Sequence, residues 1–326
     1  MAQKSLRFVV PFLVKALVVA ALVAHPALAD EHGPGQLTDT PSGFIDGTHF
    51  PALDDFTRRA AQSLPSSPNV RLLPRPEEAT IGSSYTFWSW DFAKSSFHQV
   101  SAVLQRIGQN VELYIESGRS LSSGVLDDIV YKFDNYMFTR EHQAFGTEPN
   151  PGIDGSPRVT ILMHDIRDGP YYGWGGGLVG GYFWAVNEYR QADLDQWYPG
   201  LYKSNEREMI FADVSATIPG SRESHQVIAH EFHHLIHWAT DADEEGWINE
   251  GFADLAPQLS SLGMVSSHVQ SFLNNPNNNL VRGGSDVLAD YGAYGLFGLY
   301  LWEQHGGDAA TYDMTNNPAN GIAGVD

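Results

Sequence analysis

Two histidines four residues apart, His230 and His234, are the residues in this sequence best placed to do chemistry. Residues at this spacing lie on one face of an α-helix, so the two imidazoles can point at a single ion. Glu231 lies on the flank of the same face, where its carboxylate can act on a water held by that ion without being a ligand. This HExxH pattern suits Zn²⁺, which in catalytic sites takes three protein ligands and leaves a fourth position for water.

A third ligand is expected a short way downstream. The longer pattern HExxHxxGxxH would supply it from the same segment, but His237 stands at the glycine position and Thr240 at the last ligand position. Glu250 fits better, because it lies on a second predicted helix with Asp254 one turn further on.

Helix geometry separates Glu250 from the acids of the connection, Asp241, Asp243, Glu244 and Glu245. A helix rises about 1.5 Å per residue, so the first helix carries these acids past its end and too far along the axis from His234. A second helix that returns antiparallel from about Gly246 brings Glu250 back level with the residues just after His234, and Asp254 level with His230.

The run Asn249-Glu250-Gly251-Phe252-Ala253-Asp254 matches the motif NExxxD at all three fixed positions. With HExxH, it resembles the gluzincins, the thermolysin-like clan of zinc metallopeptidases, although the segment between the two motifs is shorter than in thermolysin. The stretches 232–238 and 247–251 are most similar to secreted bacterial metallopeptidases of the hyicolysin type. The resemblance implies Glu250 as the third zinc ligand, with Asn249 and Asp254 as partners that orient the imidazoles.

The resemblance also implies an endopeptidase that hydrolyses peptide bonds of protein or peptide substrates. Zinc would activate a water and Glu231 would act as general base. A tyrosine of the C-terminal lobe would stabilise the oxyanion, with Tyr291 as the candidate and Tyr294 as the reserve, although tyrosines on a helix often only pack. Two alternatives stay open. A zinc aminopeptidase shares the chemistry, but its usual Gly-x-Met-Glu-Asn strand has no match, and a non-catalytic secreted binding module would not need Glu231.

Three further histidines, His225, His233 and His237, are expected to lie on a histidine-rich surface of the first helix. His233 and His237 are also four residues apart, but no glutamate follows the first of them. We therefore do not expect them to hold the zinc.

The first 29 residues are typical of a secretory signal, with Lys4 and Arg7 at the charged start, a short apolar run, and Ala27-Leu28-Ala29 as the cleavage site. A retained membrane anchor is the alternative, but Pro11 leaves the apolar stretch short for a span. Loss of this segment changes the formal net charge from −20 to −23, because it holds three basic residues and no acidic one. We therefore expect a secreted protein that binds neither nucleic acid nor, after signal cleavage, a membrane.

The chain has no cysteine, which excludes a disulfide framework, a cysteine nucleophile and a thiolate metal site. Its acidic loops make structural Ca²⁺ a further candidate beside Zn²⁺.

The resemblance implies an α+β fold of the zincin type, with a β-containing N-terminal lobe, a mainly helical C-terminal lobe and zinc in the cleft between them. Residues 30–80, rich in Pro, Gly, Ser and charge, are predicted as a linker or propeptide, with a flexible tail as the alternative. Aromatic and β-branched residues over 81–120 predict a small β subdomain, and 121–326 form the predicted catalytic domain. Residues 321–326 are similar to the start of another helix, so this domain can extend beyond the sequence.

Three apolar runs are predicted as strands, 158–163, 181–186 and 209–214. Strand 181–186 is predicted as an edge strand, which in the gluzincins lies beside the zinc and pairs with the extended substrate. The alternative is a hydrophobic strand without a role in binding. Ser221 is expected to cap the helix of the first motif.

Overall fold

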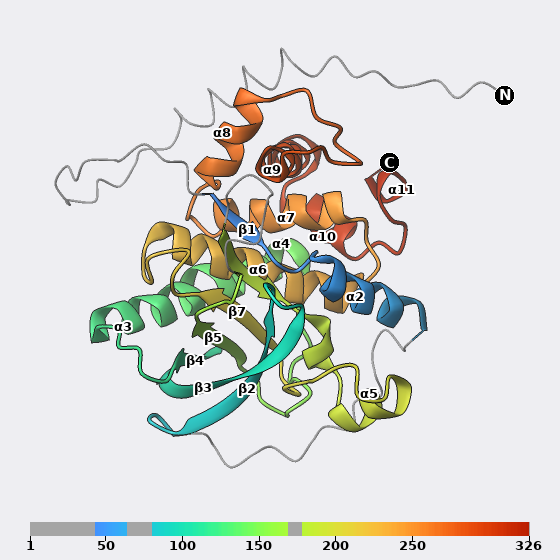
Figure 1. Ribbon diagram of the computed structural model, residues 1–326. Helices are drawn as coiled ribbons and strands as arrows, with labels where there is room; N and C mark the ends of the chain where they lie inside the picture. The colour runs from blue at the N-terminus through green and yellow to red at the C-terminus, as the bar shows by residue number, and fades with distance from the viewer. Residues whose placement is uncertain (1–42, 64–79, 169–177, 326) are drawn as a thin grey trace. The chain divides into compact units, whose positions relative to one another are not determined.

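A seven-stranded mixed sheet runs through the described part of the molecule (Figure 1). The computed structural model describes residues 43–63, 80–168 and 178–325, so the predicted signal segment 1–29 and much of the predicted linker lie outside it. The strand order is β1-β6-β7-β5-β4-β3-β2. The strands are β1 (Phe44–Asp46), β2 (Ser84–Asp91), β3 (Ser96–Ile107), β4 (Val111–Glu116), β5 (Val159–His164), β6 (Leu178–Phe183) and β7 (Met209–Asp213).

The helices of the described residues alternate with the strands as far as β7, and every element after β7 is a helix. They are α2 (Pro51–Ser63), α3 (Ser123–Lys132), the π-helical turn η1 (Phe133–Met137), α4 (Phe138–Phe145), the 3₁₀ turn η3 (Ala185–Glu188), α5 (Gln191–Trp197), α6 (Arg222–Thr240), α7 (Gly246–Leu259), α8 (Ser266–Asn274), α9 (Val287–His305), α10 (Asp308–Thr315) and α11 (Ile322–Val325). The mixture of helices and strands expected from the sequence is confirmed.

The centre of the sheet is its most apolar part. β5 pairs in parallel with both β4 and β7. Every residue of β5 and β7 is buried, which explains why their sequences are continuous apolar runs rather than alternating ones. Both strands were predicted from these runs.

The strands β2, β3 and β4 come from residues 81–120, the predicted small β subdomain. They form an antiparallel meander, and the pairing of β4 with β5 joins them to the same sheet as the strands of the predicted catalytic domain. All of them belong to one compact unit, Ser42–Asp326. The 81–120 region is therefore continuous with the sheet that supports the helices.

The helix α6 lies on the sheet against β6 and β7. It begins after Ser221, whose side chain accepts a hydrogen bond from the backbone N–H of Ser224, as predicted. Its approach to β6 is close: a Cβ at Gly181 would lie 2.8 Å from Cγ of Glu231 and 2.7 Å from the backbone oxygen of Phe211. Glycine at this position therefore allows the helix to bring Glu231 against the strand.

The helices α7, α8 and α9 form successive contacts that begin at α6. α7 packs on α6, α9 packs on α7, and α8 packs on α9, on the side of α6 away from the strands β2–β5 (Figure 1). The contact between α7 and α9 is also close, since a Cβ at Gly295 would lie 2.8 Å from Cβ of Asp254. Among the described helices, none is both long and apolar enough for a membrane span.

The strand β6 contradicts one prediction. It was expected at an edge of the sheet, but it lies between β7 and β1, and β1 comes from residues predicted as linker or propeptide.

Candidate metal centre

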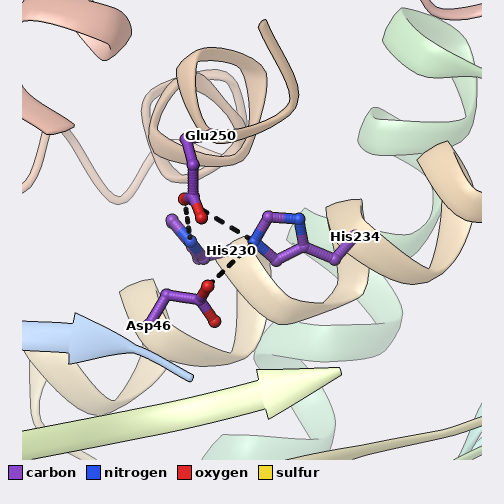
Figure 2. A group of neighbouring side chains, drawn as sticks. All are labelled: Asp46, His230, His234 and Glu250. Carbon is purple, nitrogen blue, oxygen red and sulfur yellow. Dashed lines mark ion pairs between the residues drawn. The ribbon is translucent and has the colours of Figure 1, made fainter. Parts of the chain in front are cut away.

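Four buried side chains converge between α6, α7 and the end of β1: Asp46, His230, His234 and Glu250 (Figure 2). One ligand atom from each lies within 4.8 Å of the others, so the group could hold a metal ion. None of the four is more than 5% exposed.

Glu250 lies beside both histidines (Figure 2). Its Oε2 is 3.2 Å from Nε2 of His230 and 3.8 Å from Nε2 of His234. Asp46 approaches from the opposite side, with Oδ2 3.8 Å from Nε2 of His234 (Figure 2). Both imidazoles thus turn the same nitrogen, Nε2, toward the carboxylates, as expected for two histidines one helical turn apart.

The second nitrogen of each imidazole is held by a residue of α7. Nδ1 of His230 lies 3.1 Å from Oδ1 of Asp254, and Nδ1 of His234 lies 2.5 Å from Oδ1 of Asn249. These bonds place a proton on Nδ1 and leave the lone pair of Nε2 free for a cation. Asn249 and Asp254, predicted to orient the imidazoles, therefore lie beside the two rings.

Asp254 has a further contact that sequence reasoning missed. Its Oδ2 lies 2.8 Å from Nδ1 of His268 on α8, and Nε2 of His268 lies 2.9 Å from the backbone oxygen of Phe44. His268 thereby connects α7 with β1, and its ring is fully buried.

The polar atoms at the centre of the group support its assignment as a cation site. Nε2 of His230, Nε2 of His234 and both carboxylate oxygens of Glu250 are buried without a hydrogen bond to the described residues. Unsatisfied buried polar atoms are rare in folded proteins because each costs free energy. A metal ion at this point would take all of these atoms as partners.

The electrostatics favour the same assignment. Burial, followed by the nearby carboxylate of Asp46, raises the pKa of Glu250 to about 7. Burial also lowers the pKa of His234 well below its usual range, which keeps its imidazole neutral, whereas the bond to Asp254 and the carboxylate of Glu250 raise the pKa of His230. A divalent cation would offset the repulsion between the two buried carboxylates.

Glu231 is fully buried beside this group, and its carboxylate has a different hydrogen-bond partner. Burial, and then Asp46, raise the pKa of Glu231 well above its usual range. Its Oε2 accepts a hydrogen bond from Oγ1 of Thr48 at 3.1 Å, whereas Oε1 is buried without a hydrogen bond to the described residues. Neither oxygen belongs to the four-residue group. The carboxylate therefore lies beside the group that could hold a cation and is not a member of it.

A cavity of about 600 Å³ opens next to the site. Its lining includes His234 and Glu250 together with Tyr291 and Tyr294 of α9, the predicted oxyanion candidate and its reserve. The ring of Tyr291 lies edge-on to His230, with centroids 6.5 Å apart. Burial, and then the charge of Glu250, raise the pKa of Tyr291, so its hydroxyl stays protonated and able to donate. Both tyrosines thus face the cavity beside the site.

Sequence reasoning missed Asp46 altogether as a member of the four-residue group. It lies in the stretch 30–80 that was predicted as a linker or propeptide, and no motif marks it. Its neighbours Thr48 and His49 also reach the site: Nε2 of His49 is 3.5 Å from Oε1 of Glu250. Their only sequence signal is the apolar pair Phe44-Ile45 before Asp46, which predicts a short strand but not where that strand pairs.

The prediction of a histidine-rich surface was wrong. His225, His233 and His237 are all buried. His225 pairs with Asp128 of α3 at 3.2 Å. His233 packs against Phe145, with ring centroids 4.4 Å apart, and its Nε2 lies 3.2 Å from Nδ1 of His237. The helix is covered by α4 on this side as well as by α7, so it has no wholly exposed histidine face.

A second group, His237, Asp241 and Glu244, also brings its ligand atoms within 4.8 Å of one another. Nε2 of His237 and Oδ2 of Asp241 are buried without a hydrogen bond to the described residues. An imidazole in the set is unlike a calcium site, which takes oxygen ligands, so this group does not match the expected structural Ca²⁺.

A scan against protein-family models and a search of curated proteins both find no match for this sequence.

Proposed function

We propose that this protein is a secreted zinc-dependent endopeptidase of the gluzincin type, related to the hyicolysin-type enzymes. The observation that carries the proposal is the arrangement of His230, His234 and Glu250 around one point, with Glu231 beside it and outside the ligand set. Two imidazoles and one carboxylate are a ligand set of catalytic zinc sites.

The choice of zinc follows from the donor atoms and their partners. Imidazole nitrogens favour zinc, copper, iron or nickel over magnesium and calcium. The bonds from Asp254 and Asn249 to the imidazoles are typical of zinc sites, in which the outer partner fixes the tautomer of the ligand. Bound at this site, a zinc ion supplies Lewis acidity that polarises a carbonyl oxygen and lowers the pKa of water.

In this mechanism Glu231 is the general base. A buried carboxylate with a raised pKa is a stronger base than an exposed one, so it takes a proton from water more readily, and it then passes that proton to the more basic leaving amine. The hydroxyl of Tyr291, protonated and at the cavity, is the proposed donor to the oxyanion of the tetrahedral intermediate, with Tyr294 as the reserve.

The two-lobed zincin arrangement is part of the proposal. In it, the sheet with α6 forms the N-terminal lobe, α7 to α9 form the helical C-terminal lobe, and the cavity that contains Tyr291 and Glu250 is the cleft. Protein or peptide chains would bind in this cleft, and the segment 1–29 would direct export.

A specific observation favours one other candidate, a non-catalytic binding module. Structural zinc sites are closed by four protein ligands, and Asp46 is the fourth candidate ligand here. The presence of Glu231 supports the enzyme instead, because a structural site has no use for a buried carboxylate beside its ligands.

The test is metal analysis combined with casein digestion, on protein purified from the medium of an expressing bacterial host. We expect about one zinc per chain, casein hydrolysis that a chelator abolishes, and recovery when zinc is restored. Protein without zinc, or hydrolysis that does not respond to chelation, would contradict the proposal.

A further inference from the structure

We infer that the segment Phe44–Phe50 occupies the substrate-binding position of its own chain, with Asp46 in the open coordination position of the metal, so that the full chain is latent. This inference concerns the regulation of the same site and rests on the proposed function. It assigns residues predicted only as linker or propeptide to a defined inhibitory contact.

The first observation is the strand β1 itself. It pairs in parallel with β6, with Phe44 opposite Leu178 and Ile45 opposite Val179, and the register then shifts so that Asp46 lies opposite Gly181. The backbone N–H of Gly47 continues the pairing by donating to the oxygen of Gly181 at 2.9 Å. Within the described residues, β6 would otherwise be an edge strand next to the candidate centre. Such an edge is where an extended peptide adds to a sheet, and β1 fills it.

The second observation is the position of Asp46 at the end of β1. Its carboxylate is buried, reaches within 3.8 Å of Nε2 of His234, and belongs to the four-residue group. The backbone N–H of Thr48 donates to its Oδ1 at 2.9 Å, which leaves Oδ2 directed at the site. Because a catalytic zinc site keeps one position for water or substrate, a carboxylate that acts as a fourth ligand at this point competes with both.

The third observation concerns the proposed general base. Oγ1 of Thr48 donates to Oε2 of Glu231 at 3.1 Å and accepts a hydrogen bond from the backbone N–H of Phe183 at 2.9 Å. The segment thus engages one oxygen of the base and a backbone donor of β6 at the same time. An extended substrate would need that donor, and water would need that oxygen.

The segment is docked by side chains on both sides of Asp46. The ring of Phe44 lies 5.0 Å from that of His268, whose Nε2 contacts the backbone oxygen of Phe44. Phe56 of α2 is fully buried against Tyr202, with ring centroids 4.6 Å apart. These contacts hold the carboxylate at the site, and Nε2 of His49 from the same segment lies 3.5 Å from Oε1 of Glu250. Substrate binding therefore requires the segment to leave.

The test compares Asp46→Ala with Asp55→Ala in the full chain. Asp55 lies just after this segment, is half-exposed on α2, and pairs with Arg59 at 2.9 Å, so it is a matched control outside the site. Each zinc-loaded protein is titrated with acetohydroxamate, a small chelator that binds accessible zinc through two oxygens, and is then assayed on casein. If the segment occupies the site about 90% of the time or more, Asp46→Ala should bind acetohydroxamate about 10-fold tighter than wild type.

Hydrolysis of casein by Asp46→Ala should rise by a similar factor, about 10-fold, while Asp55→Ala should match wild type in both measurements. A second variant, Thr48→Val, keeps the shape of the side chain and removes the hydroxyl. It should also hydrolyse faster than wild type, with zinc retained, and it tests the inference even if Asp46→Ala folds poorly.

The inference is overturned if Asp46→Ala loses zinc affinity as strongly as Glu250→Ala does, because Asp46 is then a permanent ligand. It is also overturned if zinc is retained and acetohydroxamate binds no tighter. The same experiment tests the proposed function separately. If Asp46→Ala binds acetohydroxamate more tightly but shows no casein hydrolysis that depends on Glu231, the segment does block the metal but the protein is not a peptidase.

Discussion

The helix α6 contains two pairs of histidines with the same spacing, and only one of them faces acids from two sides. His230 and His234 point toward Glu250 and Asp46, with Asp254 and Asn249 behind the rings. His233 and His237 bond to each other and lie among the rings of Phe145 and Phe252.

The two pairs also differ in the pKa values of their imidazoles. Burial alone would lower the pKa of His230, but the bond to Asp254 and then the carboxylate of Glu250 outweigh it and raise the pKa. Burial, and then the nearby His49, lower the pKa of His237 to about 3. Equal spacing on one helix therefore does not make two equal sites, because the residues that face each pair decide what it can bind.

The largest loss of zinc binding should come from Glu250→Ala, which removes the acid that contacts both His230 and His234. We expect zinc affinity to fall by more than about 100-fold, since a ligand should contribute more than the partners that orient ligands. Zinc content after dialysis, measured by elemental analysis, checks this. Wild-type affinity would show that the third ligand lies elsewhere.

Glu231→Gln should keep zinc bound at His230 and His234 but lose the hydrolysis of casein. The amide has nearly the shape of the carboxylate but cannot accept a proton, and loss of a general base costs on the order of 10²–10⁴ in rate. The turnover number on casein and the zinc content should be measured on the same preparation. Full turnover would exclude Glu231 as the base.

A smaller effect is expected from Asp254→Asn, which alters the group behind His230. The variant should bind zinc about 10- to 100-fold more weakly, because the imidazole loses the charged partner that fixes its tautomer and orientation. Competition with a chelator of known affinity measures the change. An unchanged dissociation constant would mean that helix packing alone orients the ring.

The smallest effect on the metal should come from His233→Leu in the second pair. Zinc content and casein hydrolysis should match wild type. The free energy of unfolding should fall by about 1–3 kcal/mol, because the variant leaves Nδ1 of His237 buried without its partner. Urea denaturation gives this value. Loss of zinc in this variant would mean that the two pairs are not independent.

Much of the local structure could be predicted from the sequence. The apolar runs of β5 and β7 and the cap at Ser221 follow from side-chain pattern and turn chemistry, which act over a few residues. The convergence of His230, His234 and Glu250 was also predictable, because one helical turn and a short return connection constrain where Glu250 can lie. The surface position expected for His233 was wrong because helix periodicity does not show what covers the helix.

The sequence by itself determined that His230 and His234 would lie on one face of a helix with Glu231 on its flank, since spacing along a helix sets the direction of each side chain. Only the tertiary structure decided that Asp46 closes the other side of the group and that Thr48 reaches Glu231, 183 positions further along the chain. Strand β1 is three residues long, and so short a stretch carries too little pattern to specify its partner. Its place beside β6 depends on backbone pairing and on the packing of Phe44 and Phe56, which arise only when the sheet and helices have assembled.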